Sequence, residues 1–478
     1  MDLPPHFGEG GIKTPRKKMK IEISNHLAVT EIPAELSYAI REKLTMQNPK
    51  WIENDRRGFS NYQTPRLLRF YEQSSHGGLI VPRGFGMQLV GLCKAYSVRP
   101  KYDDRRRTLP DVEFGFDAQL RPYQDDAVRD MLKHPQGVLS SPTGSGKTVM
   151  GLKLVAERKQ PCLVICHTRE LLNQWIDRIE SFLGVPRDEI GVIGGGKKKV
   201  GDRITVGLFQ SLYKCAEEIS PSFGHVVVDE CHRTPSRTFT EAVQAFDAKY
   251  LTGLSATPWR RDRLSRLIFL YLGDICHQIE PGTLHDTGDV LKADVVTRQT
   301  DFRTSLDPSS QYSRMLSELC EDPSRNRLIS ADVVQETRNS DGICLVLSDR
   351  KSHCQTLQAM LADEFGTDAE VLTGDLPNKK RAEVIDRLNA GEIKVLISTT
   401  ALLSEGFDCK GLSTLFMATP IKFSGRVIQC AGRVLRPAPG KSKAKIYDYA
   451  DMNVGPLAGS ARSRKRVYSQ FQTCQPVK

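Results

Sequence analysis

The segment VVVDECHRT, residues 226–234, places two acidic residues, a cysteine and a histidine directly after three valines. Two chemistries fit this DECH segment. Cys231 and His232 are potential zinc ligands, but a zinc site needs about four nitrogen or sulfur ligands at suitable spacing. The neighbouring Cys215 and His225 fall in no such pattern. Paired acids are instead typical of magnesium binding and water activation, and the sequence favours that chemistry.

A second chemical segment lies upstream, GVLSSPTGSGKT, residues 137–148, between a β-rich run and the helical pattern VMGLKLVAERK. Glycines let the backbone turn its N–H groups toward phosphate oxygens, and the following helix N-terminus adds its positive end. The pattern departs from GxxxxGK[ST] at its first position, where the small Ser141 replaces glycine. An ordinary glycine-rich turn is the alternative. We expect a phosphate loop for ATP made of Thr143, Gly144, Ser145, Gly146, Lys147 and Thr148.

With a phosphate loop upstream, residues of the loop and of the DECH segment can each be given an expected role. Lys147 would reach the β and γ phosphates, and Thr148 would ligate Mg²⁺. Asp229 would hold Mg²⁺ through water at the carboxyl end of its strand, where ligands of open α/β sheets bind. Glu230 would orient and deprotonate the attacking water, and His232 would relay between the ATP site and the facing domain.

The elements that position these residues follow from short apolar runs with helical patterns between them. One series comprises GVLSS, PCLVICHT, RITVGLF, HVVVDE and YLTGLSAT, and a second comprises GICLVLSD, AEVLTG, KVLISTT, TLFMATP and AKIYDYA. Runs that are apolar throughout suit strands buried on both faces of a parallel sheet. The sequence therefore predicts two successive α/β units.

Length and local composition give the expected domain organisation. At roughly 150 residues per domain, 478 residues predict about three domains. The ends of the chain are rich in basic residues, and the segment 98–110 is polar, charged and bracketed by prolines, as in a linker. The expected parts are a disordered basic arm (1–20), a small α+β accessory domain (21–112), an ATP-binding domain (113–285), a second α/β domain (286–452) and a disordered basic tail (453–478).

The overall composition bears on partners and compartment. A formal net charge of +11 favours a polyanionic partner, with solubility alone as the alternative interpretation. The twelve cysteines contain no CxxC pair, as expected of reduced thiols. No apolar run reaches the roughly 18 residues of a membrane span, and the start has no secretory signal. We expect a cytoplasmic protein of bacterial or phage type with no membrane partner.

The phosphate loop, DECH and GLSATP resemble motifs I, II and III of superfamily 2 DEAD/DEAH-like helicases. Other segments resemble the remaining motifs in family order over about residues 119–450. They are LRPYQDDAV for the adenine-reading motif, CHTRELLNQW for motif Ia, VGLFQSL for the next strand-binding motif, LSDR for IV, LTGD for IVa, ISTTALLSEGFD for V and QCAGRVLRP for VI. The resemblance implies an ATPase built from two tandem RecA-like parallel-sheet domains, preceded here by the small α+β domain.

The resemblance also implies roles for further residues around the nucleotide. Arg433 and Arg436 would neutralise the transferred phosphoryl group from across the domain interface, and Gln429 would sit near the attacking water. Adenine would be read by Gln124 with Arg121 beside it. Gly406 and Asp408 would touch the ribose or the interface. Coupling between the sites would involve His232, Ser255, Thr257 and Glu405.

Nucleic acid should cross both α/β units, held by its backbone phosphates and so with little sequence preference. A Ser or Thr after a strand is, as an alternative, often only a helix cap. The basic glycine loop GGGKKKVGDR, residues 194–203, is either a phosphate contact or a solvated turn. The expected contacts are Thr168, Arg169, Gln210, Ser211, Arg350, Thr373, Thr399 and Thr400.

Details of the motifs separate branches of the superfamily. LSATPWRRD, SEGFD and GRVLRP resemble the XPB and phage UvsW group of double-strand DNA translocases, and also restriction-enzyme motor subunits. That favours duplex, forked or branched DNA as the partner, with RNA as the alternative. GGLIVPRGF resembles the accessory domain of phage-type members, which would bind DNA; docking of a protein partner is the other interpretation. A non-catalytic nucleic-acid clamp would show a degraded motor, which this sequence does not.

Overall fold

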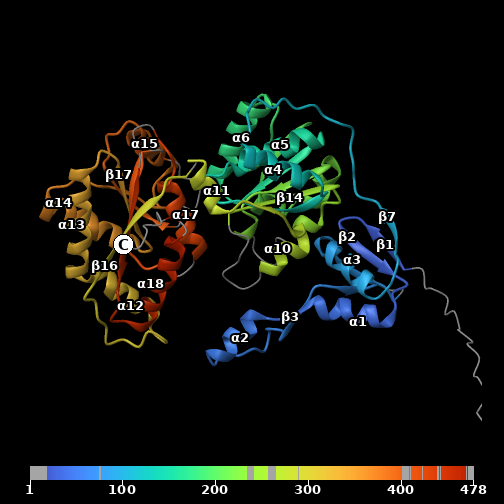
Figure 1. Cartoon of the computed structure of the whole chain (residues 1–478), viewed down its shortest axis with the longest axis horizontal. Helices are drawn as coiled ribbons and strands as arrows, with labels where there is room; N and C mark the ends of the chain where they lie inside the picture. Colours follow the sequence, from blue (N-terminus) through green and yellow to red (C-terminus); the bar gives the residue numbers. More distant parts are fainter. Residues whose placement is uncertain are drawn as a thin grey trace, which may run out of the picture.

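The computed structural model describes residues 19–74, 77–233, 242–256, 265–288, 290–400, 409, 411–421, 424–438, 441, 443–469 and 471. Within them the chain forms an N-terminal domain (residues 19–104), a first lobe (122–286) and a second lobe (293–468), each built on its own sheet (Figure 1). Both lobes carry parallel sheets, so the expected fold class, two tandem RecA-like domains after a small α+β domain, is confirmed.

The N-terminal domain is a mixed sheet covered by two helices. Its strand order is β5-β6-β2-β1-β7, with β7 parallel to β1 and the other pairs antiparallel. The strands are β1 (Lys20–Ile23), β2 (His26–Thr30), β5 (Glu72–Gln73), β6 (Leu79–Pro82) and β7 (Lys101–Asp104). The helices are α1 (Ala34–Lys43), α3 (Gly86–Ala95) and the 3₁₀ turn η1 (Arg83–Phe85).

Two expectations at the borders of this domain are corrected. The expected linker 98–110 contains the strand β7. This edge strand is exposed and charged, so its composition resembles that of a polar linker. The expected basic arm ends earlier than residue 20, since Met19 is fully buried and β1 begins at Lys20. Residues 1–18 lie outside the described part.

Between α1 and β5 the chain leaves the N-terminal sheet as an extension, residues 45–69. It consists of β3 (Thr45–Gln47), α2 (Pro49–Arg56) and β4 (Leu67–Arg69), with β3 and β4 paired as a separate two-stranded ribbon. Figure 1 shows the extension running beneath the first lobe, with α2 on the side of the second lobe.

The first lobe is an eight-stranded sheet in the order β11-β10-β12-β9-β13-β14-β8-β15, parallel except for the edge strand β11. The strands are β8 (Gln136–Ser140), β9 (Cys162–Cys166), β10 (Gly191–Gly194), β11 (Lys197–Lys199), β12 (Ile204–Leu208), β13 (His225–Val228), β14 (Tyr250–Ser255) and β15 (Ile275–Gln278). The helices are α4 (Pro122–Leu132), α5 (Lys147–Arg158), α6 (Arg169–Leu183), α7 (Phe209–Leu212), α8 (Ala216–Ile219), α10 (Ser265–Leu272) and α11 (Pro281–Asp286), with the 3₁₀ turns η2 (Ser220–Ser222) and η3 (Cys231–Arg233).

The second lobe is a six-stranded parallel sheet in the order β16-β21-β20-β17-β19-β18. The strands are β16 (Ala293–Gln299), β17 (Ile343–Ser348), β18 (Glu370–Leu372), β19 (Val395–Thr399), β20 (Leu412–Met417) and β21 (Ala444–Ala450). The helices are α12 (Tyr312–Glu321), α13 (Pro323–Asn339), α14 (Lys351–Phe365), α15 (Asn378–Asn389), α17 (Ser424–Val434) and α18 (Gly455–Tyr468).

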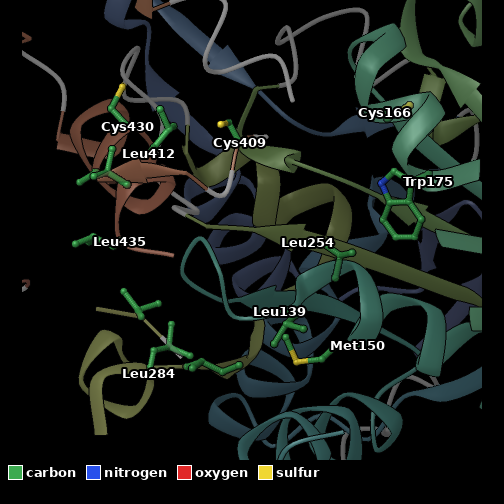
Figure 2. Close-up of a cluster of buried hydrophobic side chains, with 14 of the residues drawn as sticks. Leu139, Met150, Cys166, Trp175, Leu254, Leu284, Cys409, Leu412, Cys430 and Leu435 are labelled. Carbon is green, nitrogen blue, oxygen red and sulfur yellow. The ribbon is translucent and has the colours of Figure 1, made fainter. Parts of the chain in front are cut away.

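The apolar runs are explained by burial on both faces of each sheet. In β13 the side chain of Val227 joins a cluster with α4, α5 and α6, whereas Val226 and Val228 join a cluster on the opposite face with α8 and α10. The core of the N-terminal domain belongs to that second cluster, so the domain packs on this face of the first lobe. The first cluster continues into the second lobe, and Figure 2 shows Leu139 and Met150 on one side of it and Leu412 and Cys430 on the other.

A buried arginine fastens the N-terminal domain to the first lobe. Arg83, 3% exposed, donates to the carbonyl oxygens of Ala248 at 2.6 Å and Lys249 at 2.7 Å and also to Gln136 Oε1. A Cβ added at Gly84 would lie 2.2 Å from the carbonyl oxygen of Phe269 in α10. Only glycine therefore permits this close approach of η1 to the lobe.

The expectation of a disordered tail over 453–478 is wrong for the part that the structure describes. Residues 455–468 form α18, which packs against α17 and β21. Its Arg464 is buried and donates to Asp448 Oδ1 at 2.7 Å and to Ser460 Oγ at 3.1 Å. The basic run concealed apolar residues at helical spacing, Leu457, Ala461 and Tyr468 among them. Residues 472–478 lie outside the description.

Two further observations concern the chain as a whole. Within the described helices, none combines the length and the apolar character needed to cross a bilayer. The cysteines that the structure describes are all free thiols, most of them buried.

Candidate active site

The expected phosphate loop connects β8 to α5 and turns through two left-handed glycines. Gly144 has φ +92° and Gly146 has φ +84°, values that residues other than glycine rarely adopt. The loop starts beside β14, because the amide of Ser141 donates to the carbonyl of Ser255 at 2.9 Å. Ser141 is fully buried and its hydroxyl faces that of Ser145, so the residue that replaces glycine stabilises the turn from within.

Gln124 clamps this loop from α4. Its side chain accepts from the amide of Arg121 at 3.0 Å and donates from Nε2 to the carbonyl of Ser145 at 2.8 Å. The hydroxyl of Tyr123 reaches the same carbonyl at 3.3 Å. A Cβ at Gly146 would lie 2.5 Å from Gln124 Nε2. The structure thus brings Arg121 and Gln124 to the phosphate loop, while their role at the adenine stays a prediction.

The loop is suited to bind the phosphates of a nucleoside triphosphate. Its two positive-φ glycines and the N-terminus of α5 direct backbone N–H groups toward one place, and Lys147 lies at that helix start, with Nζ 3.3 Å from the carbonyl of Ser141. Thr143 and Thr148 are half-buried at either end of the turn. These groups match the charge and shape of phosphate oxygens.

The two acids follow β13 and lie in a desolvated position. Asp229 accepts from Trp175 Nε1 at 2.9 Å through Oδ2, and from the amide of Glu230 at 2.9 Å through Oδ1. Burial, and then the charge of Glu230, raise the pKa of Asp229 to about 6, against the opposing charge of Lys147. Glu230 has φ +46°, a left-handed backbone conformation that residues other than glycine rarely adopt and that is typical of functional sites. A buried carboxylate beside a half-buried one forms a donor set that suits a divalent cation.

Trp175 is a residue of the candidate site, a donor to Asp229, that the sequence reasoning missed. It lies on α6, is 1% exposed and belongs to the buried cluster drawn in Figure 2. A tryptophan on the apolar face of an amphipathic helix is indistinguishable from core by its spacing. The signal that could have identified it was the indole N–H, since a buried Trp usually donates this group to an acceptor.

His232 connects the acids to the neighbouring strand. Its Nδ1 lies 3.0 Å from Ser255 Oγ at the end of β14 and 3.3 Å from Glu230 Oε2. The structure therefore brings together two of the expected coupling residues, His232 and Ser255. Thr257 and Glu405, the other two, lie outside the described residues, as do Gly406 and Asp408.

The zinc interpretation finds no support around the DECH segment. Cys231 is fully buried, and burial raises the pKa of its thiol, so the thiolate that zinc requires is disfavoured. Across the described residues, no group of three or more His, Cys, Asp or Glu side chains is placed to hold a metal.

The second lobe reaches the phosphate loop through α17. A Cβ added at Gly432 would lie 2.7 Å from Thr143 Cβ, so the helix backbone lies directly against the loop. Arg433 is the next residue of α17 and is half-buried, and Arg436 follows the end of the helix. Gln429 belongs to the same helix, but its side chain lies outside the description. The helix that carries the expected arginines thus adjoins the phosphate loop.

The expected nucleic-acid contacts of the first lobe surround the start of α6. Thr168 is the N-cap of α6 and accepts from the amide of Leu171 at 3.3 Å, so it has the capping role as well. Arg169 lines a groove of about 680 Å³ with Arg187 and Lys197, beside the hairpin β10-β11 that the basic glycine loop forms. Gln210 is exposed and Ser211 half-buried on α7.

The expected contacts of the second lobe follow β17, β18 and β19. Arg350 donates to the carbonyl and the hydroxyl of Ser313 at 3.0 and 2.9 Å. Thr373 is half-buried after β18. Thr399 and Thr400 are 8% and 1% exposed, and the hydroxyl of Thr400 donates to Asp349. The Thr400 hydroxyl therefore stabilises the loop that contains Asp349 and is not presented to solvent.

An ion pair between the lobes was also missed. Arg381 on α15 reaches Glu170 on α6, with Nη1 2.7 Å from Oε1, and its side chain is only 15% exposed. Glu170 immediately follows Arg169, so this contact joins the lobes beside the expected nucleic-acid path. Charges distant in sequence give no sign that they pair.

Comparison with known proteins agrees with this geometry. Residues 117–260 match the family model "Type III restriction enzyme, res subunit", and residues 326–438 match "Helicase conserved C-terminal domain". The chain is 37% identical over 160 residues to "DNA 3'-5' translocase XPB2" of Sulfurisphaera tokodaii, covering 34% of this chain and 36% of that protein. It is 25% identical over 466 residues to "Putative ATP-dependent RNA helicase L396" of Acanthamoeba polyphaga mimivirus, covering 92% and 82%.

A solved structure shows the same fold. The "ATP-dependent Type ISP restriction-modification enzyme LlaBIII bound to DNA" matches with a TM-score of 0.55 and 15% identity, covering 74% of this chain and 30% of that one. The two family models match in the order of the motifs, and the structure has a phosphate loop and two adjacent acids at the end of β13. We conclude that the chain belongs to the superfamily 2 helicases and is a helicase ATPase.

Proposed function

We propose that this protein is an ATP-dependent DNA translocase that moves on, or unwinds, duplex or branched DNA. The observation that carries the proposal is the contact between Gly432 of α17 and Thr143 of the phosphate loop. It indicates that a nucleotide at the loop is met by arginines of the other lobe. Nucleotide binding and hydrolysis would then close and open the two lobes on a bound strand.

The residues divide the chemistry between the lobes. Loop amides and Lys147 bind the phosphates, and Thr148 with Asp229 would hold Mg²⁺, which supplies charge neutralisation at the transferred phosphoryl group. Glu230 orients the attacking water and accepts its proton. Arg433 and Arg436 neutralise charge from the second lobe, assisted by Gln429. His232 and Ser255 transmit the state of this site to the adjoining strand end.

Two features favour DNA over RNA. The relative with the higher identity carries a DNA translocase name, and the motif details LSATPWRRD and GRVLRP resemble those of double-strand DNA translocases and of restriction-enzyme motor subunits. The RNA alternative has an observation of its own, since the relative covering 92% of the chain is named a putative RNA helicase. Phosphate contacts by Arg169, Gln210, Arg350 and Thr373 would not separate the two. The free thiols suit a reducing compartment, the cytoplasm.

The test is ATPase activity and strand separation measured side by side on several nucleic acids. Single-stranded DNA, blunt duplex, forks, four-way junctions and RNA are compared at one salt concentration, because phosphate binding depends steeply on salt. We expect duplex or branched DNA to stimulate ATP turnover at least about tenfold more than RNA, a difference of roughly 1.4 kcal/mol. Stimulation by RNA alone would replace DNA with RNA in the proposal.

A further inference from the structure

The extension, residues 45–69, exposes an unusual concentration of large apolar side chains. Among the described residues, eleven large hydrophobic side chains are exposed, and four of them lie in this stretch. Tyr62 is 94% exposed, Phe59 61%, Leu67 43% and Ile52 41%. Helix α2 buries none of its side chains. Solitary exposed apolar residues are ordinary, but a group on a projecting element marks a binding surface.

These side chains are held out by an ordered polar scaffold. Asn54 donates to Asn61 Oδ1 at 3.1 Å, and Asn61 donates to the carbonyl of Trp51 at 3.2 Å. Asn48 closes the base of the extension by donating to the carbonyl of Pro65 at 2.8 Å. Side-chain amides therefore fold the segment 57–66 onto α2 without a hydrophobic core. The rings of Phe59 and Tyr62 are displayed by a defined loop.

Basic residues interleave with the rings. The extension contains five basic residues, Lys50, Arg56, Arg57, Arg66 and Arg69, and two acids, Glu53 and Asp55, so its net charge is 5 − 2 = +3. The Arg66 guanidinium lies over the Trp51 ring, 5.4 Å from its centroid. Aromatic faces among arginines form the platform on which proteins stack unpaired bases while binding the backbone phosphates. The centre of a protein-binding surface would be poorer in charge.

We propose that the extension is a binding site for unpaired bases of a nucleic-acid strand, with Phe59 and Tyr62 as stacking surfaces and the arginines of α2 and β4 on the phosphates. This inference rests on the proposed function, because it assigns a place to the strand that the motor handles. The N-terminal domain is fixed to the first lobe by Arg83, so the platform moves with that lobe. Its position on the side of the second lobe would keep a displaced strand close to the motor (Figure 1).

The test uses the full chain with Phe59→Ala and Tyr62→Ala combined, and Tyr62→Ala alone as a second variant. Tyr38→Ala is the matched control, because Tyr38 is a 71% exposed tyrosine of the same domain on α1, outside the extension. Affinity is measured by fluorescence anisotropy for single-stranded DNA, single-stranded RNA and blunt duplex. Forks carrying 2-aminopurine in the unpaired arm report stacking directly.

Removing one stacking ring should weaken single-strand binding by about fivefold or more, and removing both by at least about tenfold. Blunt-duplex affinity and the Tyr38→Ala variant should stay within about twofold of wild type. The arm showing the larger loss, DNA or RNA, identifies the strand that the platform prefers. Unchanged single-strand affinity, an equal loss on blunt duplex, or unaltered 2-aminopurine quenching would each overturn the proposal.

The two proposals fail in different ways. If no nucleic acid stimulates the wild-type ATPase, the proposed function fails. If DNA stimulates it but the double variant binds single strands as wild type does, only the platform is excluded. A charge variant of the arginines in α2 and β4, Arg56→Gln with Arg69→Gln, should reduce the slope of log affinity against log salt by up to about 2, since each lost phosphate contact removes about one unit.

Discussion

At the scale of single residues, the buried carboxylate of Asp229, the proposed Mg²⁺ ligand, is oriented by a side chain from another element. Trp175 donates to it at 2.9 Å from within the apolar core, and the amide of Glu230 holds its second oxygen. Both contacts come from groups with almost no freedom to move. A hydrogen bond to a buried charged group contributes roughly 1.5–3 kcal/mol, so its loss should be measurable in catalysis.

Trp175→Phe removes this donor while keeping most of the aromatic volume. We expect turnover to fall roughly tenfold or more and the Mg²⁺ concentration for half-maximal ATPase activity to rise, because Asp229 loses its orientation. Ile179→Val is the control, since it also leaves a small cavity under the buried face of α6. A normal Mg²⁺ dependence in the Phe variant would show that the indole serves packing alone.

Glu230→Gln tests the assignment of the general base. The amide cannot accept the proton of the attacking water, so turnover should drop by about 10²- to 10⁴-fold while ATP still binds. Steady-state ATPase assays and nucleotide-binding titrations measure the two quantities separately. Glu218→Gln is the control, because Glu218 is an exposed acid of the same lobe paired with Lys198. Wild-type turnover in the Glu230 variant contradicts the assignment.

At the scale of elements, α17 is positioned so closely against the phosphate loop that one methyl group should disturb the contact. Gly432→Ala places a Cβ 2.7 Å from that of Thr143, although alanine favours a helix interior over glycine by about 1 kcal/mol. We expect an unchanged or slightly raised melting temperature together with ATPase activity lowered about tenfold or more. The lobes would then be held apart by a helix that is itself intact.

Gly459→Ala provides the matched comparison for this variant. Gly459 also lies inside a helix, α18, but a Cβ there meets nothing within 4 Å. Its ATPase activity should equal that of wild type. Equal activity in both glycine variants would mean that the contact at Thr143 has no part in turnover.

Elements with strong local signals could be predicted from the sequence, and those whose partners lie far away could not. The run of β9 and the three valines of β13 are apolar throughout because these strands are buried on both faces, and both strands were predicted correctly. The phosphate loop was predicted because its glycines and Lys147 are contiguous. Helix α18 was missed because the charge of its buried Arg464 is neutralised by Asp448, a residue of another element.

The candidate site shows the same division. Residues predicted from motif order, such as Lys147 and Asp229, lie where one strand end meets one loop. Trp175 and the pair Arg381 and Glu170 depend on contacts between elements, which no local pattern encodes. Thr400 was predicted as a nucleic-acid contact, whereas its own side chain is buried and its hydroxyl donates to the exposed Asp349 of the same lobe.

At the scale of the whole molecule, the three parts are joined unequally. The N-terminal domain shares a buried apolar cluster with the first lobe and inserts Arg83 among its carbonyl groups. The two lobes share a buried apolar cluster as well, and the polar contacts of the described residues between them include the ion pair of Arg381 with Glu170. We infer that the N-terminal domain and first lobe act as one body, against which the second lobe moves.

Arg83→Met tests that architecture. Burial lowers the pKa of Arg83 to about 9, so the group is still charged at neutral pH, and the oxygens that it bonds and the carboxylates of Asp104 and Asp247 stabilise that charge. Methionine fills similar space but leaves those acceptors buried without their donor, at a cost of roughly 2–4 kcal/mol. Calorimetry of wild type should give one transition for the N-terminal domain with the first lobe and another for the second lobe. In the variant, the first should split or move to lower temperature while the second stays.

Limited proteolysis gives an independent reading of the same change, since an undocked N-terminal domain would expose the extended segment 105–121 to cleavage. Arg105→Met is the control, because Arg105 is an exposed arginine of the same region whose ion pairs with Glu22 and Asp103 lie at the surface, where solvent screens them and they contribute little to stability. It should melt and resist proteolysis as wild type does. If the Arg83 variant did the same, the N-terminal domain would be held by its apolar contacts alone, and the extension could swing independently of the motor.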